Sequence, residues 1–388
     1  MSQYEYIRGG ERCLYFFEKS VWNKNHARQN QSWSTILISG SASTGLICEV
    51  IESGIGAIPY TGIIRLWPGS KSIYKDYIRW IVSSDQFDTQ ISIYQAGSTI
   101  KHFGPEHLKK MEVTLPPLPE QQAIAAFLDR ETGRIDALIA KKQRLLELLA
   151  EQRTALISRA VTRGLDPKVK LKPSGVEWLG DVPEHWGVKK LKFIGTSLIG
   201  LTYSPNELVD EDYEGEKHLV LRSTNIQDGK ISLHENVYVT TRVSKELKVR
   251  KLDILICARN GSRHLVGKNA LIHETDDNMT FGAFTTVFRS KINPFLFYYF
   301  SSNQFQYQST GFLTTTINQL TNGNLNSIIA SIPPLPEQQA IAAFLDRETA
   351  KIDTLSTKVS AVIERLKEYR TALISSAVTG KIDVRGSV

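Results

Sequence analysis

Several short combinations of reactive residue types occur in the sequence, and none forms a complete catalytic or metal-binding set. Asn293-Pro294-Phe295 has one proline fewer than the Asn-Pro-Pro-Tyr/Phe motif of adenine methyltransferases, and we expect a helix to begin there. Glu246-Leu247-Lys248 has a nuclease-like spacing without the preceding Pro-Asp, and His273-Glu274 lacks the second histidine of a zinc peptidase. His102 and His107 lie on a predicted loop that favours contact with nucleic acid or solvent over a metal. A glycine-rich phosphate loop with its lysine is also missing, so we expect no catalytic residue and no metal ligand.

Residue types that recognise nucleic-acid bases are concentrated in a few predicted loops. Arginine bonds guanine, and asparagine or glutamine bonds adenine, through two hydrogen bonds each, while Lys, Ser and Thr mostly contact phosphates. The glycine between Arg259 and His264 predicts a tight turn that presents this cluster together. For any single residue, an ordinary solvated loop position is the alternative. The expected nucleic-acid contacts are Ser41, Ser43, Lys101 and His102 in the first half of the chain, and Arg222, Arg259, Asn260, Arg263, His264, Asn318 and Gln319 in the second.

An internal repeat organises the elements that must position these residues. The sequence PPLPEQQAIAAFLDRET occurs at 116–132 and again at 333–349, which is a shift of 217 residues. The likeness continues without a gap, because Arg153-Thr154-Ala155-Leu156-Ile157-Ser158 matches Arg370-Thr371-Ala372-Leu373-Ile374-Ser375. The chain is therefore built from two tandem units, each a less regular region followed by this shared segment.

The shared segment predicts a long helix in each copy. Pro119 and Pro336 fit a first helical position, Glu120 and Glu337 fit the positive first turn, and proline is absent from the following forty or so residues. Apolar residues recur at spacings of three and four and predict a seam along which the two helices pack on each other, although a generic coiled-coil dimer contact is the alternative. The predicted seam positions are Ile124, Leu128, Ile135, Leu138, Leu145, Leu149 and Leu156 in the first copy, and Ile341, Leu345, Ile352, Leu355, Val359, Val362, Leu366 and Leu373 in the second.

The regions before the helices are rich in β-branched and aromatic residues and predict two α+β domains. Strands are expected at 35–38, 61–66, 253–257 and 285–288, and short helices near 75–84 and 294–302. The expected boundaries are a first domain at 1–115, a helix at 116–163, a connector at 164–186 anchored by Trp178 and Trp186, a second domain at 187–331 and a helix at 332–380.

Composition limits the remaining possibilities. The chain has 388 residues, of which 41% are hydrophobic, so two or three domains with real cores are expected. An apolar run long enough for a bilayer and a signal-peptide pattern are both missing, which predicts a soluble, cytoplasmic protein. Cys13, Cys48 and Cys257 are scattered and odd in number, so buried thiols are expected. The net charge of +7 favours a polyanionic partner only modestly.

The duplicated PPLPEQQAIAAFLDRET segment, together with SGVEWLGDVPEHW at 174–186, resembles the specificity subunit of type I restriction–modification enzymes. The resemblance covers essentially residues 35–388 and implies an α+β fold with two target-recognition domains, separated by two long antiparallel coiled-coil helices and related by a pseudo-two-fold repeat. One feature departs from the family pattern. The box GVEWLGDVPEHWGVKKLKF precedes only the second domain, so we expect either a first domain shortened by some forty residues at its N-terminus or a first domain that is built differently.

The resemblance also implies a non-catalytic subunit that reads the two halves of a split DNA site. Its implied partners are double-stranded DNA, two copies of an adenine methyltransferase subunit, and motor-nuclease restriction subunits. S-adenosylmethionine, ATP and magnesium are expected on those partners and no cofactor on this chain. Arg130, Arg134, Arg347 and Lys351 are candidates for docking the partners, with surface salt bridges as the alternative. A stand-alone bivalent DNA-binding regulator or adaptor without enzymatic partners is the alternative function.

Overall fold

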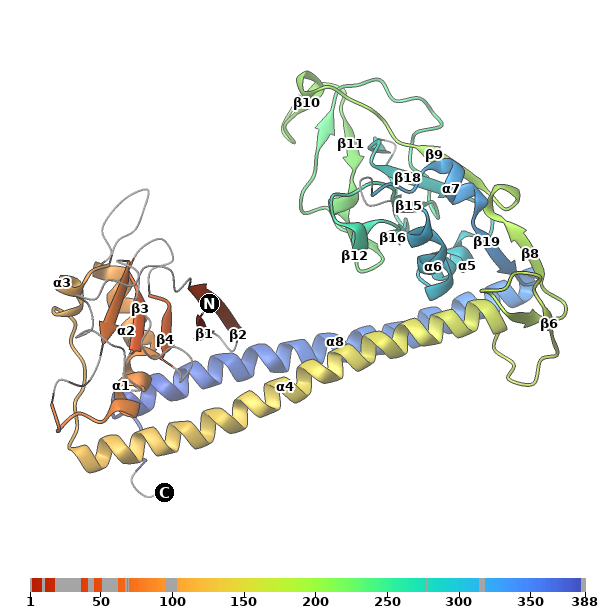
Figure 1. Cartoon of the computed structure of the whole chain (residues 1–388). Helices are drawn as coiled ribbons and strands as arrows, with labels where there is room; N and C mark the ends of the chain where they lie inside the picture. The colour runs from red at the N-terminus through yellow and green to blue at the C-terminus, as the bar shows by residue number, and fades with distance from the viewer. Residues whose placement is uncertain are drawn as a thin grey trace. The chain divides into compact units, whose positions relative to one another are not determined.

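The computed structural model describes residues 2–8, 11–17, 36–40, 45–50, 62–66, 68, 70–94, 103–276, 278–313 and 318–384 (Figure 1). It confirms the predicted α+β fold with two long helices, α4 (Leu118–Arg163) and α8 (Leu335–Val378). The chain forms two compact units, of which unit 1 comprises residues 1–146 and 357–388, and unit 2 comprises residues 147–356. Each unit therefore contains one part of α4 and one part of α8.

Unit 1 contains a five-stranded antiparallel sheet in the order β2-β1-β4-β3-β5. Its strands are β1 (Ser2–Arg8), β2 (Glu11–Phe17), β3 (Ile36–Ser39), β4 (Ile47–Glu49) and β5 (Ile63–Leu66). Helices α1 (Lys75–Val82), α2 (Asp85–Tyr94) and α3 (Pro105–Leu108) follow the sheet. Strands β3 and β5 and helix α1 confirm the elements predicted at 35–38, 61–66 and 75–84. Three successive apolar residues of β3 are buried, because β3 lies inside the sheet and is covered on both faces.

Unit 2 contains two four-stranded sheets, in the orders β16-β15-β18-β9 and β10-β14-β11-β17. The first is antiparallel and consists of β16 (Asn269–Leu271), β15 (Ile254–Cys257), β18 (Thr285–Arg289) and β9 (Thr196–Ile199). The second consists of β10 (Leu208–Val209), β14 (Tyr238–Val239), β11 (His218–Leu221) and β17 (Met279–Phe281), with β11 and β17 parallel. Three two-stranded pairs complete the unit: β12 (Ile226–Gln227) with β13 (Lys230–Ile231), β19 (Ile329–Ile332) with β8 (Gly187–Lys190), and β6 (Leu171–Pro173) with β7 (Asp181–Pro183).

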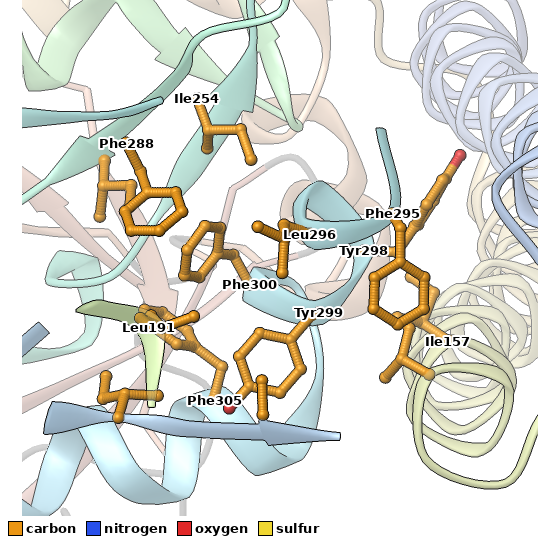
Figure 2. Close-up of a cluster of buried hydrophobic side chains, with 14 of the residues drawn as sticks. Ile157, Leu191, Ile254, Phe288, Phe295, Leu296, Tyr298, Tyr299, Phe300 and Phe305 are labelled. Carbon is orange, nitrogen blue, oxygen red and sulfur yellow. The ribbon is translucent and has the colours of Figure 1, made fainter. Parts of the chain in front are cut away.

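Helices α5 (Asn293–Phe300) and α6 (Asn303–Gly311) supply the aromatic part of the unit 2 core, and α7 (Asn322–Ser327) adds Leu325. Phe288 from the sheet and Phe300 and Phe305 from the helices pack edge to face (Figure 2). Ile157 of α4 belongs to the same cluster, so the sheet, the short helices and the long helix share one core. Asn293 begins α5 as predicted, and its buried amide Nδ2 donates to the carbonyls of Leu252 and Phe288. The tripeptide at 293–295 is therefore a structural helix start.

The predicted seam of the long helices is correct for most positions and wrong for three. Leu138, Leu355 and Val362 are 41%, 44% and 39% exposed, whereas Ile139 and Ile363 are buried at 6% and 5%. The physical reason is the difference between the 3.6-residue turn and a strict 3.5-residue repeat, which moves the buried stripe by about 20° per heptad. A seam assigned at one end of such a helix therefore shifts by one position further along.

The same contacts recur in both units at equivalent positions of the repeat, and each domain uses both long helices. In unit 1 the indole of Trp80 donates to Asp129 of α4 at 3.2 Å, and the N–H of Asp85 donates to Ser375 of α8 at 3.0 Å.

In unit 2 the hydroxyl of Tyr298 donates to Asp346 of α8 at 2.5 Å, and the N–H of Asn303 donates to Ser158 of α4 at 3.0 Å. Asp129 and Asp346 are equivalent in the repeat, as are Ser158 and Ser375. Each domain thus docks on the beginning of the helix that follows it and on the end of the other one.

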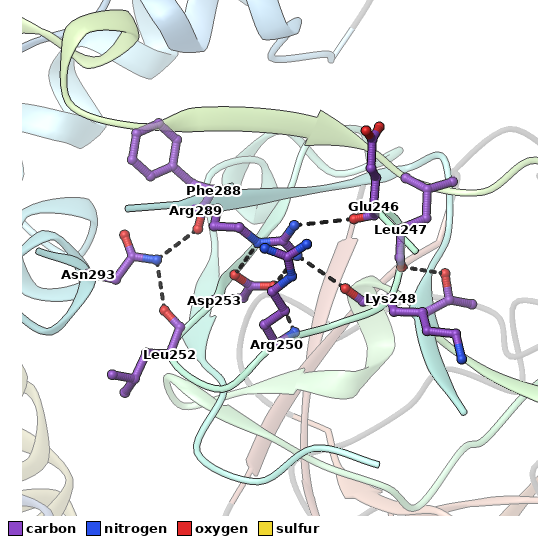
Figure 3. A network of polar contacts seen from close by, with 10 residues as sticks. Glu246, Leu247, Lys248, Arg250, Leu252, Asp253, Phe288, Arg289 and Asn293 are labelled. Carbon is purple, nitrogen blue, oxygen red and sulfur yellow. Dashed lines mark hydrogen bonds and ion pairs between the residues drawn. The ribbon is translucent and has the colours of Figure 1, made fainter. Parts of the chain in front are cut away.

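A buried ion pair holds the loop that precedes β15 (Figure 3). The Arg289 guanidinium donates to both carboxylate oxygens of Asp253, at 2.8 and 2.6 Å, and also to the carbonyls of Glu246 and Lys248. Asp253 is 2% exposed and accepts a further bond from the N–H of Arg250. The nuclease-like triplet at 246–248 therefore serves as a main-chain anchor for this arginine.

The connector is fixed through Trp186, which is 1% exposed and donates its indole N–H to Glu337 at 3.0 Å. His185 bonds the same carboxylate oxygen at 2.7 Å. Trp178 is half-buried and packs against the ring of Tyr307, with a centroid separation of 5.8 Å. Both predicted tryptophan contacts are thus made within unit 2.

Candidate nucleic-acid interface

In unit 2 the structure brings together the loop after β15 and the segment before α7. The N–H of Leu320 donates to Ala258 at 2.7 Å, and Arg259 forms an isolated β-bridge with Gln319. The N–H of Asn260 donates to the carbonyl of Asn318 at 3.3 Å. Two hydrogen-bonded segments of the chain therefore carry four of the predicted recognition residues, namely Arg259, Asn260, Asn318 and Gln319.

The turn at 260–264 is built differently from the prediction. Gly261 does not require a left-handed backbone, and a Cβ there would meet open space. The side chain of Asn260 makes the turn instead, because its Oδ1 accepts the N–H of Ser262 at 2.9 Å. The Asn318 amide donates to the Gly261 carbonyl at 2.9 Å and holds the same turn from the other side.

Arg263 and His264 are both exposed and lie in a single 3₁₀ turn, Arg263–Leu265. The Arg263 guanidinium donates to the carbonyl of Thr310 at 3.1 Å, so one of its edges already has a partner. Arg222 is half-buried and donates to the Glu235 carbonyl at 3.3 Å, and its neighbour Ser223 lies 3.5 Å from the Asn260 amide. Arg222 is therefore adjacent to the cluster and partly committed to holding the loop that leads to Glu235.

An exposed phenylalanine adds an aromatic surface that the sequence did not reveal. Phe284 is 61% exposed, and its carbonyl accepts the N–H groups of both Ala258 and Arg259 at 3.0 Å. The Arg259 guanidinium carbon lies 5.3 Å from the centre of the Phe284 ring, in a cation–π contact. An arginine supported by an aromatic ring is an arrangement that stacks on bases and reads guanine. Residue type alone could not identify Phe284, because most phenylalanines whose exposure the structure describes are buried or partly buried.

The candidates of the first domain, Ser41, Ser43, Lys101 and His102, lie outside the residues that the structure describes. The residues next to them are described and closely placed, since the N–H of Phe103 donates to the Gly40 carbonyl at 2.7 Å. A Cβ on Gly40 would come within 2.4 Å of the Phe103 carbonyl oxygen, which explains the glycine. This bond is the unit 1 counterpart of the bond from Leu320 to Ala258. In each unit, the two candidate loops therefore adjoin the same backbone hydrogen bond in the sequence.

The four predicted docking residues lie on exposed helix faces and have intrahelical partners. Glu131 accepts from Arg130 and Arg134 at 2.9 Å each, and this pairing lowers the pKa of Glu131. In the second copy, Glu348 accepts from Arg347 at 2.9 Å and from Lys351 at 3.0 Å, with the same effect on its pKa. Arg130 and Arg347 also lie over the rings of Phe127 and Phe344. The surface salt bridges weighed as the alternative are thus present, and they leave 37% to 70% of these basic side chains exposed.

Among the described residues, His, Cys, Asp and Glu side chains do not gather in threes as a metal site requires, and none of the described helices could span a membrane. Cys257 is buried as predicted, and Cys48 is half-buried.

Fold and loops together define a two-domain recognition protein built on an internal repeat. A family model described as the type I restriction modification DNA specificity domain matches residues 3–148 and 183–365. The specificity subunit of the type I restriction enzyme EcoKI from Escherichia coli (strain K12) is 30% identical over 381 residues, covering 92% of this chain and 77% of that subunit. The StySPI specificity subunit from Salmonella potsdam is 30% identical over 210 residues, covering 52% of this chain and 44% of that subunit. The chain therefore belongs to the family of type I restriction–modification DNA specificity subunits.

Two solved structures share this fold at low sequence identity. A chain from a structural study of complex assembly and conformational transition in a type I restriction–modification system has a TM-score of 0.72 at 16% identity, covering 91% of this chain and 83% of that one. The HsdS subunit from Thermoanaerobacter tengcongensis has a TM-score of 0.50 at 16% identity, covering 91% and 82%.

Proposed function

We propose that this chain reads a two-part DNA site, one half with each unit, and that α4 and α8 hold the two reading loops at a set separation. The observation that carries the proposal is the equivalent pair of loops in the two units. Each pair starts from one main-chain bond, between Phe103 and Gly40 in unit 1 and between Leu320 and Ala258 in unit 2, and the residues beyond these bonds differ. One frame that carries two different sets of polar residues suits two different half-sites.

We infer that the chain itself is non-catalytic and acts through partners. A methyltransferase subunit would bring S-adenosylmethionine and extrude one adenine in each half-site, because the reactive atom is out of reach inside the stack. Restriction subunits would bring ATP, magnesium and the motor-nuclease. The absence of complete catalytic motifs from the sequence supports this division of labour.

The repeat also supports two copies of one docked partner. The segments 116–132 and 333–349 are identical at exposed positions as well as buried ones, for example at Ala126 and Ala343. Packing inside the chain explains identity at the buried positions only. A shared partner that binds each copy explains the exposed ones, and Arg130, Arg134, Arg347 and Lys351 flank the same faces.

The reading loops are tested by mapping methylated adenines genome-wide in cells that express the chain with its methyltransferase subunit. We expect one bipartite motif. Arg259→Ala should reduce methylation about tenfold or more, since a bidentate arginine–guanine contact is worth about 1–3 kcal/mol, and should relax one position of one half-site. The matched control is Arg242→Ala, an exposed arginine of unit 2 outside the loops. A contiguous motif in the wild type would refute the two-part reading, and an unchanged motif in Arg259→Ala would refute the loop assignment.

The docking faces are tested with Ala126→Glu and Ala343→Glu, each compared with Ala140→Glu. All three alanines are exposed on the long helices, but Ala140 lies outside the identical segments. In mass photometry of the assembled complex, each of the first two variants should lose one methyltransferase subunit, and the control should keep both. Stable DNA binding by the chain alone, without association with a methyltransferase subunit in gel filtration, would favour the stand-alone regulator.

A further inference from the structure

Two ion pairs between α4 and α8 join the same two positions of the repeat with the copies exchanged. In unit 1, Asp136 of α4 accepts from Arg370 of α8. In unit 2, Arg153 of α4 donates to Asp353 of α8. Asp136 and Asp353 are equivalent at the 217-residue shift, and so are Arg153 and Arg370. Each helix thus presents one aspartate and one arginine to its antiparallel neighbour.

The two ion pairs differ in the number of hydrogen bonds and in the exposure of the arginine. Arg370 reaches both carboxylate oxygens of Asp136, at 2.8 and 3.2 Å, and its side chain is only 16% exposed. Arg153 makes one bond to Asp353, at 3.1 Å, and is 28% exposed. Partly buried ion pairs between helices contribute more to the choice of pairing than to stability, and the two-pronged Arg370–Asp136 pair is the more specific of the two.

Both pairs form in one register only. A slide of α8 by one heptad would put Asp136 opposite Ile363 in one direction and opposite Ala377 in the other. Both of these residues are buried in the present structure, so the carboxylate would face an apolar surface. Such a slide moves one helix by about 10 Å along the other, which corresponds to about three base pairs of DNA.

We propose that Asp136–Arg370 and Arg153–Asp353 are positioning residues that fix the register of α4 against α8, and through it the length of the unread spacer between the half-sites. This inference rests on the proposed two-part reading. The apolar seam alone permits neighbouring heptad registers, because its residues recur with the same spacing along both helices. The charged pairs remove that degeneracy together with the domain contacts to both helices, and the duplication of the pairs applies the constraint in both units.

The test compares Arg370→Asp and Arg153→Asp with the charge-swapped doubles Asp136→Arg/Arg370→Asp and Arg153→Asp/Asp353→Arg. The assay is genome-wide methylation with the methyltransferase subunit, scored for the native half-sites at the native spacer and at spacers up to three base pairs longer or shorter. Glu364→Lys is the control, because it also reverses a charge on α8, but the partner of Glu364, Lys367, lies on the same helix.

Each single reversal should lower methylation at the native spacer about tenfold and raise the share of other spacers, and each double should return to within about twofold of wild type. Circular dichroism and gel filtration with the methyltransferase subunit verify folding and assembly, and Arg153→Asp serves if Arg370→Asp does not fold. The register role would be overturned if methylation fell by the same factor at every spacer length, or if the charge-swapped doubles failed to restore methylation at the native spacer. A wild type without a bipartite motif would instead overturn the proposed function.

Discussion

Replacing Asp253 by alanine should destabilise unit 2 strongly, because it leaves Arg289 without its carboxylate. Asp253 is 2% exposed and accepts three hydrogen bonds, two from the Arg289 guanidinium and one from the Arg250 N–H (Figure 3). Removing one partner of a buried ion pair costs about 3–5 kcal/mol. Arg289 keeps the carbonyls of Glu246 and Lys248, at 3.3 and 3.1 Å, so we expect the lower end, about 3 kcal/mol.

Urea unfolding of the full chain, followed by tryptophan fluorescence and circular dichroism, measures this loss. A change of about 3 kcal/mol corresponds to a fall in Tm of about 6–12 °C for a unit of this size. The matched control is Asp212→Ala, an exposed aspartate of the same unit, which should change the unfolding free energy by less than about 0.5 kcal/mol. A loss below about 1 kcal/mol in Asp253→Ala would show that the carbonyls alone satisfy Arg289, and the reasoning would be wrong.

Three further outcomes follow from single side chains. Phe284→Ala should weaken specific DNA binding by the assembled complex about tenfold in a competition assay, since stacking of a base on an aromatic ring is worth about 1–3 kcal/mol. The control is Phe193→Ala, which should leave binding unchanged, because Phe193 is 71% exposed and lies outside the reading loops. Burial raises the pKa of Cys48 to about 11, so at pH 8 its thiol should be alkylated far more slowly in the folded chain than in the urea-unfolded chain. The alkylation rate of the folded chain should rise as the pH approaches 11. Equal rates for the folded and unfolded chains, measured by peptide mass spectrometry, would contradict this. Trp186→Phe removes a hydrogen bond to the Glu337 carboxylate and should lower the unfolding free energy by about 1–2 kcal/mol in urea titration.

The repeat made most of the fold predictable, because identical segments at a fixed shift must form the same element twice. Strands and short helices were also located correctly, from β-branched runs such as Ile254 to Cys257 and from the proline after Asn293. The seam was harder, since helical periodicity fixes a stripe but not its slow rotation along the helix. That rotation decides whether Leu138 or Ile139 is buried.

The candidate site was predictable in its loops and not in its details. Residue type indicated Arg259 and Asn318 as base-reading groups, and the structure places them on bonded segments. The exposure of Phe284 depends on where β17 and β18 turn, which is a tertiary property that leaves no local pattern. The role of Asn260 in making its own turn likewise depends on a side-chain bond that competes with the expected glycine turn.

The contacts that recur in both units explain how one frame can carry unrelated loops. Phe103 and Leu320 donate their backbone N–H groups to Gly40 and Ala258, and any residue except proline could donate in the same way. Because these bonds involve main-chain atoms, the requirement they impose on side chains is small apart from the glycine at position 40, where a Cβ would meet the Phe103 carbonyl oxygen. The sequences beyond the bonds can therefore differ at little cost in stability. The contacts between the two long helices behave in the opposite way, since a pair such as Asp136–Arg370 depends on side-chain charge and is repeated without change. Sequence identity is therefore retained where side chains determine the geometry, and it is lost where the backbone does.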